Sequence, residues 1–144
     1  MELIFDNETL EKYPERCRLI SKGYADLVAD KCYLTPDIQI YVENISDREW
    51  DENLRILAGD GDDAGQWKIL IPFDEYVGHV FRMHVATGFT LIIYDLIHGE
   101  GAFNKIKDPE IYQKIYNKVE PYFVELLQTY GSIKSFNVEV EDGR

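Results

Sequence analysis

Cysteine is scarce in this sequence, and its spacing argues against two kinds of site. The chain has 144 residues and only two cysteines, Cys17 and Cys32. The pair has neither the Cys-x-x-Cys spacing of zinc ligands nor the numbers of a disulfide framework. We therefore expect two small, buried thiols in a reducing compartment. No cofactor is predicted.

Long apolar runs are also missing. No stretch approaches the roughly 20 uninterrupted apolar residues that span a membrane. The first residues, Met1–Asp6, lack the basic start of a secretory signal. We expect a cytoplasmic protein that does not bind membranes. Without repeats, low-complexity tracts or a linker, residues 1–144 are predicted to form a single domain.

Basic residues are few, and the acidic surplus is concentrated. Lysine and arginine number 15 against 27 aspartates and glutamates, which gives a formal net charge of −12. Of this, −9 falls on residues 1–63 and −3 on the remainder. Phosphate binding requires clustered cations, so double-stranded nucleic acid is a poor partner for the acidic half. Local charge instead predicts a binding surface for a basic partner.

The first half of the chain predicts alternating strands and helices. Residues 2–6 are a short strand, with Asn7 and Thr9 as candidate caps for a first helical turn. Apolar residues from Cys17 to Val28 recur at helical spacing and predict a helix from Pro14 to about Lys31. Residues 38–43 alternate as a half-buried strand. Ser46 to Glu49 form a capping box that predicts a helix ending at Gly59.

The second half contains one ambiguous segment. Residues 67–73 alternate as a strand, and Pro72 indicates an edge or a strand end. The run 80–97 suits a β-hairpin turning at Thr87-Gly88, although Asp74 is also a candidate cap for a helix over 75–86. Asp108-Pro109 predicts the start of a helix whose apolar face continues to Tyr130. Pro121 predicts a kink in this helix. Residues 133–141 read as a final strand.

Together these elements predict an α+β fold. We expect a single domain with a largely antiparallel sheet and about three helices packed mainly on one face.

Catalytic and metal motifs are weak. His79 and His84 are five residues apart and point apart in either a strand or a helix. His98 lies near Glu100, which leaves a small enzyme with acid–base chemistry as one hypothesis. Asp60, Asp62 and Asp63 resemble part of a calcium loop, but Ala64 and Ile71 stand where ligands are required. No metal site is predicted. The glycines of residues 99–105 lack phosphate-loop spacing.

The leading hypothesis is an acidic binding protein that inhibits or neutralises a basic partner by occluding its active site. An immunity protein to a bacterial toxin, or a viral antagonist of a nuclease-type defence enzyme, fits this class. Acids would steer and pair with lysines and arginines, and exposed aromatics would add contact area. The predicted partner-binding residues are Tyr41, Glu43, Asp47, Trp50, Asp51, Glu52, Asp60, Asp62 and Asp63.

A second hypothesis is a small-ligand or nucleotide-binding protein, with a sequestering homo-oligomer as one form. One face of the expected hairpin would be apolar yet carry cations, and such a face requires a cover. The predicted ligand-binding residues are Arg82, His84, Lys105 and Lys107.

Overall fold

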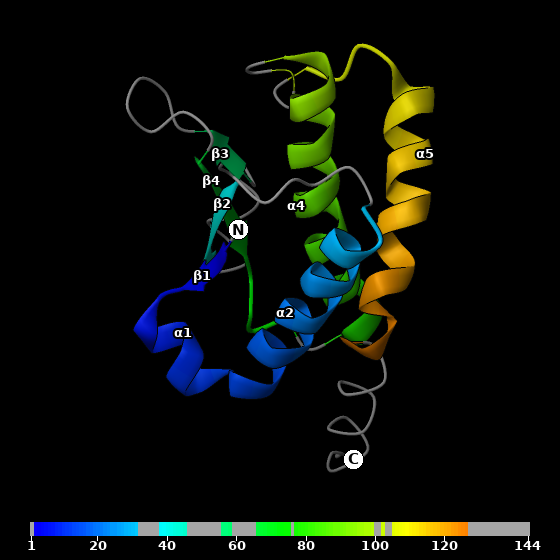
Figure 1. Ribbon diagram of the computed structural model, residues 1–144. Helices are drawn as coiled ribbons and strands as arrows, with labels where there is room; N and C mark the ends of the chain where they lie inside the picture. Colours follow the sequence, from blue (N-terminus) through cyan, green and yellow to red (C-terminus); the bar gives the residue numbers. More distant parts are fainter. Residues whose placement is uncertain are drawn as a thin grey trace.

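The computed structural model describes residues 2–31, 38–45, 56–58, 66–75, 77–99, 102 and 105–126. Helices pack against a small sheet, as Figure 1 shows. In chain order the elements are β1 (Glu2–Phe5), α1 (Asn7–Lys12), α2 (Pro14–Ala29), β2 (Gln39–Asn44), β3 (Ile56–Ala58), β4 (Gln66–Ile71), α4 (Gly78–His98), α5 (Pro109–Val119) and the 3-10 helix η3 (Glu120–Phe123).

The sheet has the strand order β1-β2-β4-β3. β1 and β2 are parallel, and so are β2 and β4, while the short β3 runs antiparallel to β4 at one edge. The α+β class is confirmed, but the prediction of a largely antiparallel sheet is wrong. Alternating burial is the same in both kinds of sheet, so the sequence pattern did not reveal strand direction. Parallel β1 and β2 require a crossover, which α1 and α2 provide.

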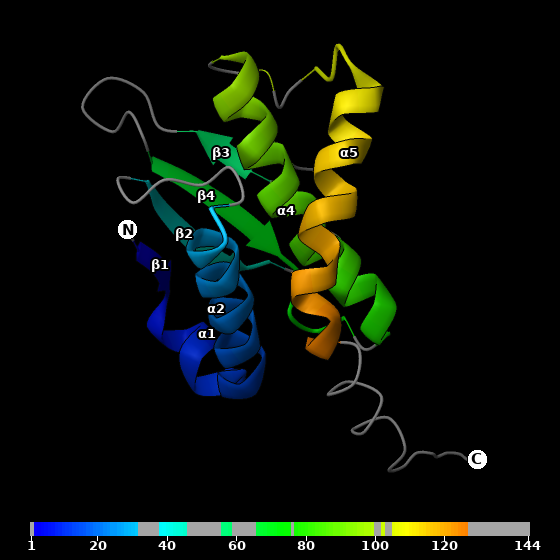
Figure 2. The ribbon, with the colours of Figure 1, turned by 45° about the vertical axis from the view of Figure 1, so that its right-hand side comes forward.

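One face of the sheet is buried beneath the helices. Along β2, Ile40 and Val42 are buried while Gln39 and Tyr41 are only partly covered, and β4 repeats this alternation. Figures 1 and 2 show α2, α4 and α5 on the same side of the sheet. The core therefore lies between this face and the helices.

The predicted helix over residues 14–31 is confirmed as α2. Pro14 occupies its first turn, and its buried side includes Cys17, Ile20, Tyr24 and Leu27. α1 begins differently from the prediction, because Asp6 is its cap. The Asp6 carboxylate accepts hydrogen bonds from the backbone N–H and the hydroxyl of Thr9.

The hairpin predicted for residues 80–97 is wrong, because the whole segment belongs to α4. This helix is apolar on most sides, so it lacks the one-sided periodicity that identifies a surface helix. Gly88 is no turn residue but a point of close packing. A Cβ there would lie 2.6 Å from Cγ2 of Ile69 on β4.

α4 is the one described helix long and apolar enough to cross a membrane. However, 61% of its apolar window is buried inside the protein. That burial is consistent with the core helix of a soluble protein.

The helix predicted from residue 46 to Gly59 is wrong at its end, since residues 56–58 form β3. Pairing with the open edge of β4 satisfies the backbone of this segment. The rest of that predicted helix, residues 46–55, lies outside the described residues.

The predicted helix after Asp108 is confirmed as α5. The Asp108 carboxylate accepts from the backbone N–H of Ile111 at 3.2 Å. The α-helix ends at Val119, and η3 takes over around Pro121, where the missing N–H prevents regular continuation. The predicted strand over 133–141 lies outside the described residues.

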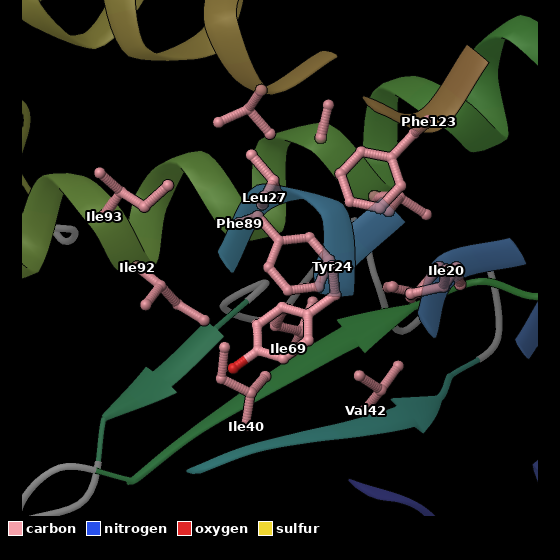
Figure 3. Close-up of a cluster of buried hydrophobic side chains, with 14 of the residues drawn as sticks. Ile20, Tyr24, Leu27, Ile40, Val42, Ile69, Phe89, Ile92, Ile93 and Phe123 are labelled. Carbon is pink, nitrogen blue, oxygen red and sulfur yellow. The ribbon is translucent and has the colours of Figure 1, made fainter. Parts of the chain in front are cut away.

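Aromatic rings join three elements at the centre of the core. Phe89 of α4 stacks on Tyr24 of α2 and on Phe123 of η3, with ring centroids 5.6 and 5.3 Å apart (Figure 3). Stacking of this kind adds to the burial of apolar area. It fixes α2, α4 and η3 against one another.

Candidate acidic interface

The three parallel strands end at the same edge of the sheet. Asp6 follows β1, Asn44 ends β2, and Phe73 and Asp74 follow β4. The Asn44 side-chain oxygen accepts from the backbone N–H of Phe73 at 2.9 Å, which joins two of these chain ends. In open parallel sheets, this edge is where ligands usually bind.

Carboxylates gather at this edge. Asp6, Glu8 and Glu11 are exposed on and before α1, and Asp74 and Glu75 follow β4, Asp74 exposed and Glu75 half-buried. We call these five residues the acidic end. Thr9 of α1 is buried, so Glu8 and Glu11, three residues apart, share the opposite, solvent-facing side of the helix. Within the described part of the chain, neither makes an ion pair.

Tyr13 connects α1 to the loop after β4. Its hydroxyl donates a 2.8 Å hydrogen bond to Oδ1 of Asp74. Burial raises the pKa of Tyr13, and the Asp74 hydrogen bond and charge raise it further, with a smaller contribution from Glu8. Glu8 and Asp74 therefore act on the same hydroxyl, which places α1 and the β4 loop in one electrostatic environment.

Arg16, a cation at this edge, is turned inward. Its Nη1 donates to the backbone carbonyl of Phe73, and its guanidinium carbon lies 4.6 Å from the Phe81 ring centroid and 5.7 Å from that of Tyr13. Contact with both rings holds the charge against the core by cation–π attraction. Arg16 is thus half-buried against these rings, whereas Asp6, Glu8, Glu11, Lys12 and Asp74 are exposed.

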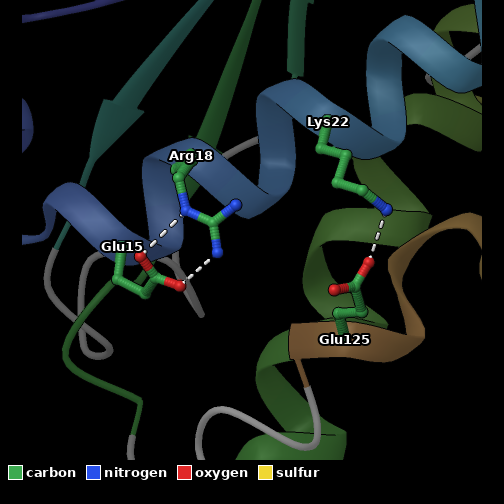
Figure 4. A network of polar contacts seen from close by, with 4 residues as sticks. All are labelled: Glu15, Arg18, Lys22 and Glu125. Carbon is green, nitrogen blue, oxygen red and sulfur yellow. Dashed lines mark hydrogen bonds and ion pairs between the residues drawn. The ribbon is translucent and has the colours of Figure 1, made fainter.

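The outer side of α2 differs from the acidic end. Arg18 is ion-paired with Glu15, and Nζ of Lys22 lies 2.6 Å from Oε2 of Glu125, as Figure 4 shows. The Arg18 hydrogen bond lowers the pKa of Glu15. Glu15 and Glu125 are therefore paired with cations, unlike Glu8 and Glu11 within the described part of the chain.

The described strands also fix where the acidic stretch of the sequence is attached. Residues 46–55 connect Ile45 to Ile56. Ile45 donates to the Ile71 carbonyl at 3.0 Å, and Ile56 pairs with Ile69, so both attachment points lie toward the carboxyl end of β4. Residues 59–65 connect Ala58 to Gln66 at the amino end instead. The predicted acids outside the described residues therefore belong to two segments that are attached at opposite ends of β4.

Two of the predicted partner-binding residues are described in full. Tyr41 and Glu43 lie on the face of β2 opposite the core, both half-buried, and Glu43 is paired with Nζ of Lys68 at 3.0 Å. This pairing reduces what Glu43 can offer a basic partner. The other predicted residues, which lie outside the described part, are Asp47, Trp50, Asp51, Glu52, Asp60, Asp62 and Asp63.

No known protein family, curated protein or solved structure matches this chain. The case for function therefore depends on the residues themselves.

The predicted ligand-binding cations are not brought together. Arg82 is paired with Oε2 of Glu120 at 3.0 Å, while His84, two positions along α4, is buried. Lys107 lies beside Tyr94, whose hydroxyl accepts from its backbone N–H. Twelve residues of helix separate Arg82 from Tyr94, a rise of roughly 18 Å. Lys105 and Lys107 thus lie near the other end of α4.

His98 packs on Tyr94, with ring centroids 4.3 Å apart. Its proposed catalytic companion, Glu100, lies outside the described residues. The nearby Asp95 is buried and accepts from Trp67 Nε1 at 3.2 Å and from the backbone N–H of Ala102 at 2.8 Å. One oxygen therefore holds the loop after α4, and the other joins α4 to β4. In the described residues, no group of three acids, histidines or cysteines is arranged to hold a metal.

Sequence reasoning missed all five residues of the acidic end. Asp6, Glu8, Glu11 and Asp74 come from two segments that are far apart in sequence, and only the parallel strand order brings them to one edge. One available signal was that Asp6 and Asp74 each closely follow an apolar strand.

Proposed function

We propose that this protein is a cytoplasmic acidic binding protein that captures a basic partner protein and neutralises it by covering its active site. The observation that carries the proposal is the acidic end: exposed carboxylates at the carboxyl edge of the sheet, with Arg16 withdrawn into contact with Phe81. An immunity protein to a bacterial toxin, or a viral antagonist of a nuclease-type defence enzyme, would work in this way.

The mechanism follows from charge. Enzymes that act on nucleic acids hold phosphate with lysine and arginine. Carboxylates of the acidic end would pair with those cations and exclude the substrate. Long-range attraction would also accelerate encounter, and salt would weaken that effect because the charges are solvent-exposed.

The first experiment identifies the partner and measures whether its enzymatic activity is inhibited. The immobilised protein is exposed to an extract of its native cell at low salt, and retained proteins are eluted with rising salt. The proposal expects a basic protein whose enzymatic activity falls when the purified protein is added back. A retained protein that keeps full activity in the saturated complex would contradict the neutralising role.

The second experiment locates the surface. The variant Glu8→Gln/Glu11→Gln/Asp74→Asn removes three charges at the carboxyl edge, and its new asparagine keeps an acceptor for Tyr13. The variant Asp60→Asn/Asp62→Asn/Asp63→Asn removes three charges from the segment attached at the amino edge. We expect the first variant to lower the association rate several-fold more at low salt than the second. Equal rates for the first variant and the unmodified protein would remove the acidic end from the proposal.

A further inference from the structure

β1 is a terminal strand of the described sheet. It pairs with β2 along Glu2–Phe5, and no other described strand pairs with its second side. A terminal strand offers unpaired N–H and C=O groups, and proteins usually protect such edges with lysine, proline, bulges or very short strands. β1 is short, with four residues, but it has neither lysine nor proline, and three of its residues are consecutive apolar ones, Leu3, Ile4 and Phe5, all half-buried.

The half-buried state of β1 suits strand addition. Leu3 and Phe5 are in register with Ile40 and Val42 and lie on the core side of the sheet, whereas Ile4 is in register with Tyr41 on the outer side. Packing of Leu3 and Phe5 against the core keeps the strand extended. An incoming strand would therefore meet a preformed edge with apolar contacts on both faces.

Charge decides between the possible occupants of this edge. Asp6, Glu8 and Glu11 directly follow β1 and are exposed, against Lys12 alone on α1. A second copy paired parallel would bring the same acids together, which like-charge repulsion opposes, and one paired antiparallel would leave them without a cation-rich partner. An extended segment rich in lysine or arginine would bring the opposite charge.

We propose that the free edge of β1 accepts an extended basic segment of the partner protein as an added strand, with its cations paired by Glu8 and Glu11. The inference rests on the proposed function and specifies how the partner is held. Backbone hydrogen bonds to β1 supply the alignment, and the carboxylates of α1 select a basic sequence.

The test uses a synthetic peptide of alternating lysine and valine in three forms of equal charge. One form is unmodified, one is N-methylated at alternate residues, and one is N-methylated at every residue. A strand presents alternate amides to its two sides, so the half-methylated peptide keeps one intact edge and the fully methylated peptide keeps none. Binding is followed by amide NMR shifts and hydrogen exchange of the intact protein.

We expect the unmodified and half-methylated peptides to bind alike and to protect from exchange those amides of residues 3–5 that face away from β2. The fully methylated peptide should bind about tenfold more weakly or worse, since several backbone hydrogen bonds are lost. Glu11→Gln should weaken binding of the unmodified peptide at low salt, whereas Glu110→Gln, the same charge change on α5, should leave it unchanged.

Three results would overturn the inference: equal affinity of the fully methylated peptide, perturbation centred on amides away from β1, or a dimer that protects β1 without peptide. This test can fail while the test of the proposed function succeeds, and the reverse is also possible. Capture and inhibition of a basic protein without β1 protection would reject strand addition and keep the function. Protection of β1 by the peptide without any neutralised partner would keep strand addition and reject the neutralising function.

Discussion

The Tyr13 hydroxyl and the Asp74 carboxylate are joined by a 2.8 Å hydrogen bond although 61 positions separate them in the sequence. The bond ties the segment that links α1 and α2 to the chain leaving β4. Because Asp74 accepts from Tyr13 while remaining exposed, the same contact fixes the fold and positions a carboxylate of the acidic end. The following predictions test the packing that creates this arrangement.

Tyr24→Phe should stabilise the protein. The Tyr24 hydroxyl is buried and has no hydrogen-bond partner among the residues that the structure describes, so its removal relieves an uncompensated desolvation cost. We expect the free energy of unfolding in urea to rise by about 1 kcal/mol. Tyr122→Phe serves as the matched control, because the Tyr122 hydroxyl donates to Asp30 at 2.6 Å and its loss should not stabilise. Destabilisation by Tyr24→Phe would show that its hydroxyl has a partner in solution.

Gly23→Ala should destabilise the packing of α2 on η3. A Cβ at Gly23 would lie 2.5 Å from Cε1 of Phe123 and 2.7 Å from the Tyr122 carbonyl oxygen, and backbone cannot yield as a side-chain end can. We expect a loss of about 1–3 kcal/mol in thermal or urea unfolding, despite the better helix propensity of alanine. Gly88→Ala, whose Cβ meets only Ile69, should cost less, and the reverse order would contradict the described packing.

Alkaline pH should destabilise the fold, in part through Cys17. Burial raises the pKa of the Cys17 thiol to about 11, with a smaller contribution from Asp6. The folded state then holds its proton while the unfolded thiol loses it near pH 9, so stability present below that pH is lost as pH rises toward 11. Urea midpoints between pH 8 and 11 measure this loss.

Cys17→Ala should flatten that pH dependence, because it removes the titrating thiol. The same burial should make Cys17 slow to react with iodoacetamide at neutral pH, measured in a Cys32→Ser background. Rapid alkylation of the folded protein would contradict the described burial.

Asp95→Asn should destabilise the loop after α4. Both Asp95 oxygens accept hydrogen bonds from donors, Trp67 Nε1 and the Ala102 N–H, so an asparagine must turn its NH₂ group toward one of them. We expect a loss of about 1–3 kcal/mol and a change in tryptophan fluorescence, measured against Asp26→Asn on the exposed side of α2. An unchanged free energy of unfolding would mean that water replaces one of the two contacts.

The sequence predicted local structure better than its assembly. α2, β2, β4 and the start of α5 follow from helical spacing, strict alternation and the Asp108-Pro109 cap. The segment that became α4 was misread because its buried residues surround the helix, which removes the periodic signal. Strand direction was misread because alternation carries no information on which way a neighbour runs.

The candidate site shows the same difference between local features, which the sequence predicts, and their assembly, which it does not. The composition alone shows that carboxylates are in excess. Which of them lie together at the carboxyl edge of the sheet follows only from the strand order. Arg16 illustrates the limit most clearly: as a charge in the sequence it offsets an acid, yet its contacts with Phe81 and Phe73 place it against the core. Tertiary packing thus decides which groups a cation contacts, and composition does not show this.

The reversed direction of β3 has an evolutionary consequence. Because β3 runs antiparallel to β4 at one side of the described sheet, the two stretches that connect it to β2 and β4, residues 46–55 and 59–65, join opposite ends of β3. Natural variation can lengthen or recharge either stretch while the hydrogen-bonded ladder between β2 and β4 persists. One scaffold could in this way acquire new binding preferences at either end independently.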